Sequence, residues 1–212
     1  MFAGKTSIPT SHGELEAIYR PRREDSSKVA LILHPHPVYG GTMHNPVVFE
    51  CARALEAAGL ETLRFNYRGV GESTGGWDEG RGERDDARVA LEFLLTAQPS
   101  AEQVVVAGYS FGAAIGLALG ADDPRVSHLV AIAAPLGLFD ASALAACSKP
   151  KLFIHGSADE LAPLEPIRTA VAETIAPPTD LRVLDGASHF FDAEQDQMGE
   201  VIQEWTRANL PA

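Results

Sequence analysis

Two hydrophobic patterns alternate along the chain, and each predicts a different kind of element. Short apolar runs are typical of parallel strands, whose two faces are both buried. Two such runs lie at residues 29–33 and 104–107, and further strands are expected at 60–67, 126–134, 151–155 and 181–184. Apolar residues at helical spacing lie in the segments 46–58, 82–97, 163–175 and 192–208. The alternation predicts an α/β fold in a single domain over residues 1–212, with a mostly parallel central sheet and helices on both faces.

Turn and capping residues indicate where several of these elements begin and end. Asn45 followed by Pro46 is typical of a helix N-terminus, and Gly59 is typical of the residue that follows a helix. Asp192 resembles the first residue of a capping box for the last helix. Residues 13–20 alternate loosely in polarity, which predicts an edge strand or one half of a hairpin.

The run 104–107 leads directly into Gly108-Tyr109-Ser110-Phe111-Gly112, and an apolar segment to about Ala121 follows. We expect a buried strand, a sharp turn and a buried helix, with Ser110 strained and its hydroxyl clear of the sheet. Gly108 and Gly112 would let the strand and the helix approach closely. The motif alone occurs by chance in about one such chain in ten, so a tight turn without function remains the alternative.

A nucleophilic serine requires a base and a carboxylate that orients the base. His189 follows the last predicted strand, and Asp159 follows the strand before it. The carboxyl ends of parallel strands share one edge of a sheet, so both side chains are expected near Ser110. The chain order Ser, Asp, His is the order that this kind of sheet uses. Asp140 and Glu160 remain alternatives for the acid.

Acyl transfer also requires backbone N–H groups that stabilise the developing oxyanion. The N–H of Phe111, at the start of a helix, is the first candidate donor. The second must come from the loop after the first apolar run, where Pro35 and Pro37 have no N–H. We therefore choose Val38 as the second donor. Tyr39 and Phe111 are candidates for the lining of an acyl pocket.

Together these motifs resemble the α/β-hydrolase superfamily, most closely its small bacterial members without a lid. The general plan is also similar to that of the dienelactone hydrolases. The residues that carry the resemblance are Gly108–Gly112, Asp159, His189, the loop 34–41 and the loop 65–73. The similarity extends over most of the chain, from about Val29 to Trp205. One departure is His34-Pro35-His36-Pro37, where many relatives have His-Gly.

In this superfamily a cap is commonly inserted between the two strands that precede the acid loop. Here that connection comprises only residues 135–149, which can hold one short helix but no further domain. We therefore expect a shallow, open site with modest selectivity. Arg68 could hold a substrate carboxylate, but a structural role is favoured. Trp77 could form one wall of the site or cover the end of a helix.

The leading hypothesis is a carboxylesterase-like serine hydrolase that acts on small-molecule esters through an acyl-enzyme and needs no cofactor. The sequence does not separate esters from thioesters, lactones or small amides. One alternative is a non-catalytic binding protein that keeps the fold. Another is a metallohydrolase that uses His34 and His36, with His44 nearby, although no carboxylate completes the set at a recognisable spacing.

Net charge and composition limit the kinds of partner that the protein is expected to bind and where it is expected to be found. The formal net charge is −12, which argues against a nucleic-acid-binding protein because such a protein needs a basic face. No apolar run is long enough to span a bilayer, and the N-terminus lacks a long apolar segment typical of a secretion signal. A soluble cytoplasmic protein is therefore expected, with Cys51 and Cys147 as buried free thiols. The oligomeric state is left open.

Overall fold

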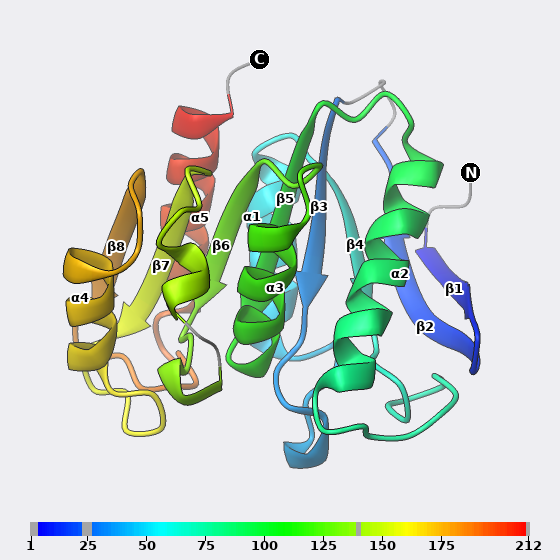
Figure 1. The fold of residues 1–212 in the computed structure, drawn as a ribbon, viewed down its shortest axis with the longest axis horizontal. Coiled ribbons are helices and arrows are strands. Elements are labelled where there is room, and N and C mark those ends of the chain that lie inside the picture. The colour runs from blue at the N-terminus through cyan, green and yellow to red at the C-terminus, as the bar shows by residue number, and fades with distance from the viewer. Residues whose placement is uncertain (1–3, 23–26, 139–140, 211–212) are drawn as a thin grey trace.

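A computed structural model describes residues 4–22, 27–138 and 141–210, which fold around one eight-stranded sheet (Figure 1). Its strand order is β1-β2-β4-β3-β5-β6-β7-β8. The strands are β1 Gly4–Thr10, β2 Gly13–Arg20, β3 Lys28–Leu33, β4 Glu61–Phe65, β5 Gln103–Tyr109, β6 His128–Ile132, β7 Lys151–Gly156 and β8 Thr179–Leu184. β1 pairs antiparallel with β2, and β2 with β4, whereas the remaining pairs are parallel. The expected mostly parallel α/β sheet is confirmed.

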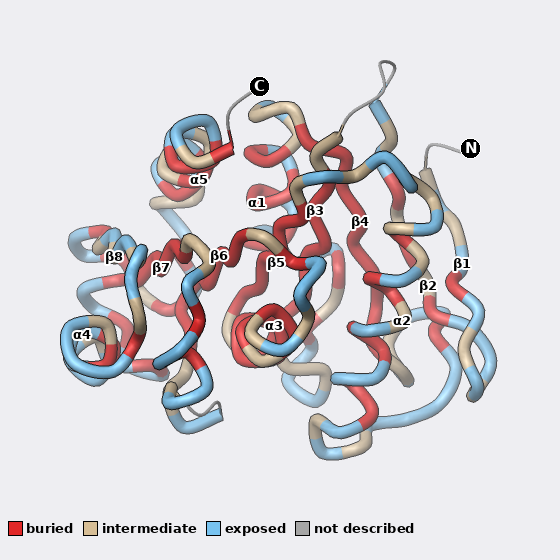
Figure 2. The backbone as a smooth tube through the Cα atoms, turned by 45° about the horizontal axis from the view of Figure 1, so that its top comes forward, coloured by how far each residue is buried: buried red, intermediate tan, exposed pale blue. Residues whose placement is uncertain are grey.

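Helices cover both faces of the sheet. Their bounds are α1 Pro46–Ala57, α2 Arg81–Ala97, α3 Phe111–Asp122, α4 Leu164–Glu173 and α5 Gln195–Asn209. α2, α3 and α4 lie on one face, and α1 and α5 lie on the other (Figures 1 and 2). In β3, Leu31 and Leu33 belong to the first core, whereas Ala30 and Ile32 belong to the second. This alternation explains why residues 29–33 of β3 are apolar without interruption.

The predicted N-terminal cap is present in α1 but not in α5. The Asn45 side chain accepts a hydrogen bond from the Val47 N–H at 2.9 Å and caps α1, as predicted. The expected capping box at Asp192 and Gln195 is wrong. α5 begins at Gln195 itself, and its N-cap residue is Glu194, which makes no side-chain capping bond.

The topology creates a crevice at one edge of the sheet. β4 and β5 lie on opposite sides of β3, so the chain leaves β3 and β5 in opposite directions. Ligands of open α/β sheets bind at such a switch point, beyond the carboxyl ends of the strands. These ends lie at the lower edge in Figure 1. The β6–β7 connection contributes only the short 3₁₀ helices η2, Leu136–Leu138, and η3, Ala141–Leu144, among its described residues, and no cap domain.

The two cysteines, Cys51 and Cys147, are free and buried, as expected from the sequence. Within the described ranges, none of the helices has the length and apolar character that crossing a membrane requires.

Candidate active site

Ser110 occupies a sharp turn between β5 and α3. Its backbone lies at φ 54° and ψ −118°, a region that residues other than glycine rarely adopt. Two glycines make the turn sterically feasible. A Cβ on Gly108 would lie 2.2 Å from the carbonyl oxygen of Gly112, and a Cβ on Gly112 would lie 2.3 Å from that of Leu33. The Ser110 N–H extends the sheet by donating to the Ile132 carbonyl at 2.8 Å, which fixes the turn against β6.

Three sequence-predicted side chains meet at this turn. His189 Nε2 lies 3.0 Å from Ser110 Oγ, and His189 Nδ1 lies 2.8 Å from Asp159 Oδ2. Since the Asp159 carboxylate can only accept, Nδ1 carries the ring proton. Nε2 is then left with a lone pair directed at the serine hydroxyl, so the geometry allows proton transfer from Ser110.

The Asp159 carboxylate is buried and held by three hydrogen bonds, with a fourth side chain nearby. Its Oδ1 accepts from the backbone N–H groups of Leu161 at 3.0 Å and Ala162 at 2.7 Å. Oδ2 faces His189, and the buried His155 Nε2 lies 3.6 Å from it. Burial raises the pKa of the Asp159 carboxyl, but the hydrogen bonds from His189 and Ala162 outweigh burial and bring the pKa below its ordinary value. The carboxylate therefore stays ionised at neutral pH.

Tyr109, the residue before the serine, fixes the loop that carries His189. Its buried hydroxyl donates to the His189 backbone carbonyl at 3.0 Å, and the two rings are 5.5 Å apart. The strand that carries Ser110 is thus linked directly to the histidine loop. This contact could not be expected from the sequence, because the two residues lie 80 positions apart.

The other candidate acids and Arg68 do not join this group. Glu160 is exposed to solvent, and Asp140 lies outside the described residues. Arg68 Nη2 pairs with Asp86 Oδ1 at 2.7 Å, and the Arg68 Nε donates to both oxygens of the same carboxylate. The structural role favoured for Arg68 is confirmed.

The loop geometry points away from Val38 as the second oxyanion donor. The Val38 N–H points at His36 Nδ1, 3.2 Å away, and the Val38 side chain is mostly exposed. His36 presents the better donor, because its own backbone N–H makes no hydrogen bond within the described chain. The Phe111 N–H, the first candidate, likewise has no partner there. His36 and Phe111 both line the cavity above Ser110. The sequence signal was available: between Pro35 and Pro37, only His36 has an N–H.

His34 has no free ring nitrogen for a metal ion. Its Nδ1 lies 2.7 Å from the Pro35 carbonyl oxygen, and its Nε2 accepts from the Tyr67 N–H at 3.0 Å. The ring is completely buried, and burial lowers the pKa of His34 to about 4. The described residues also contain no group of three or more His, Cys, Asp or Glu side chains arranged to hold a metal. The metallohydrolase hypothesis therefore has no geometric support.

The buried neutral His34 predicts a pH-dependent stability. Unfolded, a histidine binds a proton below about pH 6.5, whereas folded His34 does so only below about pH 4. Between these values the unfolded chain binds more protons, so the free energy of unfolding falls as the pH falls. His34 alone should account for a loss of about 3 kcal/mol, complete near pH 4.

Urea unfolding of the wild type and of His34→Gln at several pH values between 4 and 7 measures this contribution. The variant should lose less stability over this range. An unchanged pH dependence in His34→Gln would contradict the assignment, since buried His128 and His155, which shift in the same direction, are present in both proteins.

Two hollows adjoin the Ser110 hydroxyl. The larger encloses about 480 Å³ and reaches His189. Most of its lining is apolar, including Leu136, Leu138, Leu161, Pro163 and Pro166. The smaller encloses about 270 Å³ and is lined by His36, Tyr39, Asn45, Tyr109 and Phe190, among others. Tyr39 and Phe111 thus lie at the site as expected, whereas Val38 lines neither hollow.

Comparison with known proteins is consistent with this geometry. Residues 36–146 match the model of the alpha/beta hydrolase fold family. A protein of Rickettsia prowazekii is 33% identical over 200 residues, which cover 91% of this chain and 84% of the relative. An alpha-beta serine hydrolase homologue from Coxiella burnetii is 35% identical, with a TM-score of 0.89 over 96% of this chain and 97% of its own. A serine hydrolase without a lid from Xanthomonas campestris is 32% identical, with a TM-score of 0.88 over 99% and 96%. The chain belongs to the α/β-hydrolase fold family.

Proposed function

We propose that the protein is a serine hydrolase that cleaves small carboxylic esters through an acyl-enzyme. The observation that carries the proposal is the continuous hydrogen-bonded series from Ser110 Oγ through His189 to Asp159, with distances of 3.0 and 2.8 Å. Ser110 is the nucleophile, His189 the general base and Asp159 the acid that orients it. Relatives at 32% and 35% identity that are described as serine hydrolases support the same chemistry.

The reaction proceeds in two similar halves. Ser110 Oγ attacks the ester carbonyl carbon while its proton passes to His189 Nε2. The tetrahedral oxyanion is stabilised by the N–H groups of Phe111 and His36, and Asp159 stabilises the imidazolium. Collapse breaks the bond to the alcohol, which leaves with the proton from His189. Water then repeats the sequence, releasing the carboxylic acid and restoring Ser110.

The larger hollow supports an acyl group of varied size. Its apolar lining favours hydrocarbon, and no cap domain closes over the described site. Such a site excludes water poorly and makes few contacts that depend on the length of the acyl chain. We therefore expect broad acyl selectivity.

A panel of substrates tests the proposal. Aryl esters with acyl chains of two to ten carbons should all be hydrolysed, with kcat/KM varying by about tenfold or less per two carbons. Thioester, lactone and anilide analogues, assayed alongside, define the acyl compounds that the site accepts. If the folded protein hydrolyses none of the aryl esters, the proposal is contradicted. A sharp optimum of kcat/KM at one acyl chain length would contradict the broad selectivity.

A proline substitution tests the reassigned oxyanion donor. His36 has a φ of −55°, which proline adopts readily, so His36→Pro removes the N–H with little change of backbone. Loss of one oxyanion donor should lower kcat by about 10²–10³-fold. His36→Ala removes the imidazole but keeps the N–H, and it should retain most of kcat.

The same assay on Val38→Pro separates the two assignments. If Val38 were the donor, Val38→Pro would lose kcat by that factor and His36→Pro would not. Circular dichroism of each variant checks that the loop substitutions leave the fold intact.

A further inference from the structure

A third hollow lies beside the proposed nucleophile, and its lining combines arginine, aromatic and aliphatic side chains with the carboxylate of Glu79. It encloses about 250 Å³ and is lined in part by Trp77, Arg81 and Arg84. It shares His36, Phe111 and Leu138 with the 480 Å³ cavity. Because Phe111 directly follows Ser110, the two hollows share a wall next to the nucleophile. A substrate held at Ser110 that extends past this wall would place a substituent in the third hollow.

Of the two arginines that line this hollow, one forms ion pairs with described residues and the other does not. Arg81 forms ion pairs of 3.2 Å with both Asp78 and Glu79, so its charge is already offset, as is that of Glu79, which also lines the hollow. Arg84, in the same turn of α2, forms no ion pair with any carboxylate of the described chain. Arg88, one turn further on, pairs with Asp85 at 2.7 Å. Arg84 is thus a solvated cation at the hollow, free to receive an anion.

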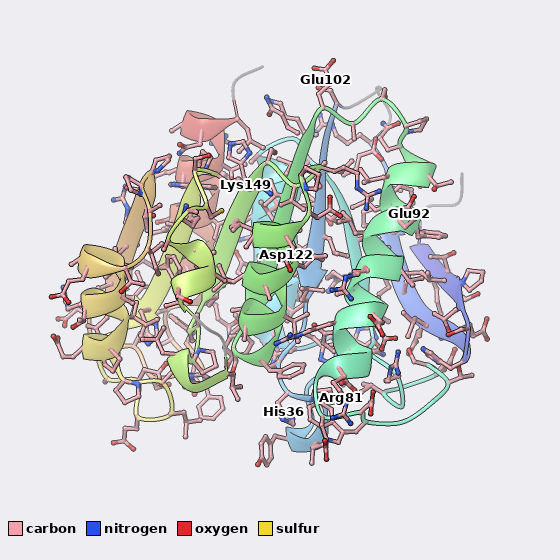
Figure 3. All side chains as sticks on the ribbon, in the orientation of Figure 1. His36, Arg81, Glu92, Glu102, Asp122 and Lys149 are labelled. Atoms are coloured by element: carbon pink, nitrogen blue, oxygen red, sulfur yellow. The ribbon has the colours of Figure 1, made fainter. Side chains whose placement is uncertain are left out.

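Aromatic side chains form part of the remaining wall. The Trp77 ring centroid lies 4.6 Å from that of His36 and 5.5 Å from that of Phe111. Figure 3 shows that labelled His36 and Arg81 lie at the same end of the molecule, beyond the carboxyl ends of the strands. A carboxylate matches the planar fork of an arginine, to which it can bind through two hydrogen bonds. The net charge of −12 opposes a polyanion, so a single negative group fits best.

We propose that Arg84, with Trp77 as an aromatic wall, forms a subsite for one carboxylate carried by the substrate. The natural substrate is then an acyl compound with a free carboxylate on either its acyl or its alcohol part. The claim about the natural substrate rests on the proposed hydrolase function. The claim that the hollow binds a carboxylate depends only on the hollow and on Arg84.

Matched substrates at low ionic strength test the catalytic part, because salt screens an exposed charge. One pair is the adipic acid monoester of 4-nitrophenol and neutral 4-nitrophenyl hexanoate. The other pair is 4-acetoxybenzoate and neutral 4-acetoxybenzamide. In at least one pair, kcat/KM should favour the anionic member by about tenfold. Arg84→Gln should abolish this preference, whereas Arg88→Gln, a matched loss of charge outside the hollow, should preserve it.

Binding without turnover tests the subsite independently. Benzoate should quench Trp77 fluorescence and bind about tenfold more tightly than benzamide, and this difference should vanish in Arg84→Gln. Loss of the quenching in Trp77→Phe would show that the fluorescence change comes from Trp77. Equal binding of benzoate and benzamide, or an unchanged difference in Arg84→Gln, would overturn the subsite.

The kinetic and binding assays together distinguish a failure of the subsite from a failure of the hydrolase function. Hydrolysis of neutral esters without any preference for the carboxylate overturns the subsite and leaves the hydrolase function intact. Selective benzoate binding by a protein that hydrolyses no ester supports the subsite and contradicts the hydrolase function.

Discussion

Replacing Ser110 with alanine is expected to lower kcat for ester hydrolysis by about 10⁶-fold, because no other group can form the acyl-enzyme. The fold should survive. Among the described residues, the Ser110 hydroxyl forms a hydrogen bond only with His189, so the substitution deletes one hydrogen bond and creates no large cavity. The residual rate should come from binding and oxyanion stabilisation alone. Steady-state and single-turnover assays with an aryl ester measure the loss.

Ser110→Gly provides the matched control for this substitution. It also lacks the nucleophile, but glycine adopts φ 54° without the strain that Ser110 and alanine incur. Ser110→Gly should therefore be equally inactive and more stable than Ser110→Ala by about 1–3 kcal/mol. Substantial activity in both folded variants would show that the serine is not the nucleophile. Equal stability would count against strain at the turn.

Replacing Asp159 with asparagine should lower kcat by about 10⁴-fold while keeping the loop structure. The asparagine oxygen can still accept the N–H groups of Leu161 and Ala162. Its amide, however, donates toward His189 Nδ1, so the ring proton moves to Nε2. The lone pair that should accept the Ser110 proton is then lost.

Glu160→Gln is the control for Asp159→Asn, because it removes the adjacent carboxylate, which is exposed to solvent. Its kcat should stay within about twofold of the wild type, since a solvated charge outside the hydrogen-bonded series contributes little. The reverse pattern, with activity kept in Asp159→Asn and lost in Glu160→Gln, would reassign the acid.

The central sheet was predictable because its strands are buried on both faces. Nearly every residue of β3, β5 and β7 is buried, and each strand was located from the sequence to within two residues. β1 was missed because only Ile8 of its seven residues is buried, and Pro9 breaks the strand pattern. An edge strand of this kind is stabilised by pairing with β2, which sequence periodicity does not report.

The part of the site whose residues are positioned by the sheet topology could be predicted from the sequence. Ser110, Asp159 and His189 follow strands that end at one edge of the sheet, so their proximity follows from the fold. The choice between His36 and Val38 depends on local loop geometry. The His36 side chain accepts the Val38 N–H within two residues, and such short-range bonds leave no periodic signal. The Tyr109 bond to the His189 loop spans 80 positions and was equally hidden.

Covalent labelling shows whether Ser110 is the activated nucleophile. The folded protein is treated with a fluorophosphonate ester, which phosphonylates activated serines, and the adduct is mapped by peptide mass spectrometry. We expect one adduct per chain, on Ser110, with labelling abolished in Ser110→Ala and greatly slowed in Asp159→Asn. No adduct on the folded wild type, or an adduct on another residue that persists in Ser110→Ala, would contradict this expectation.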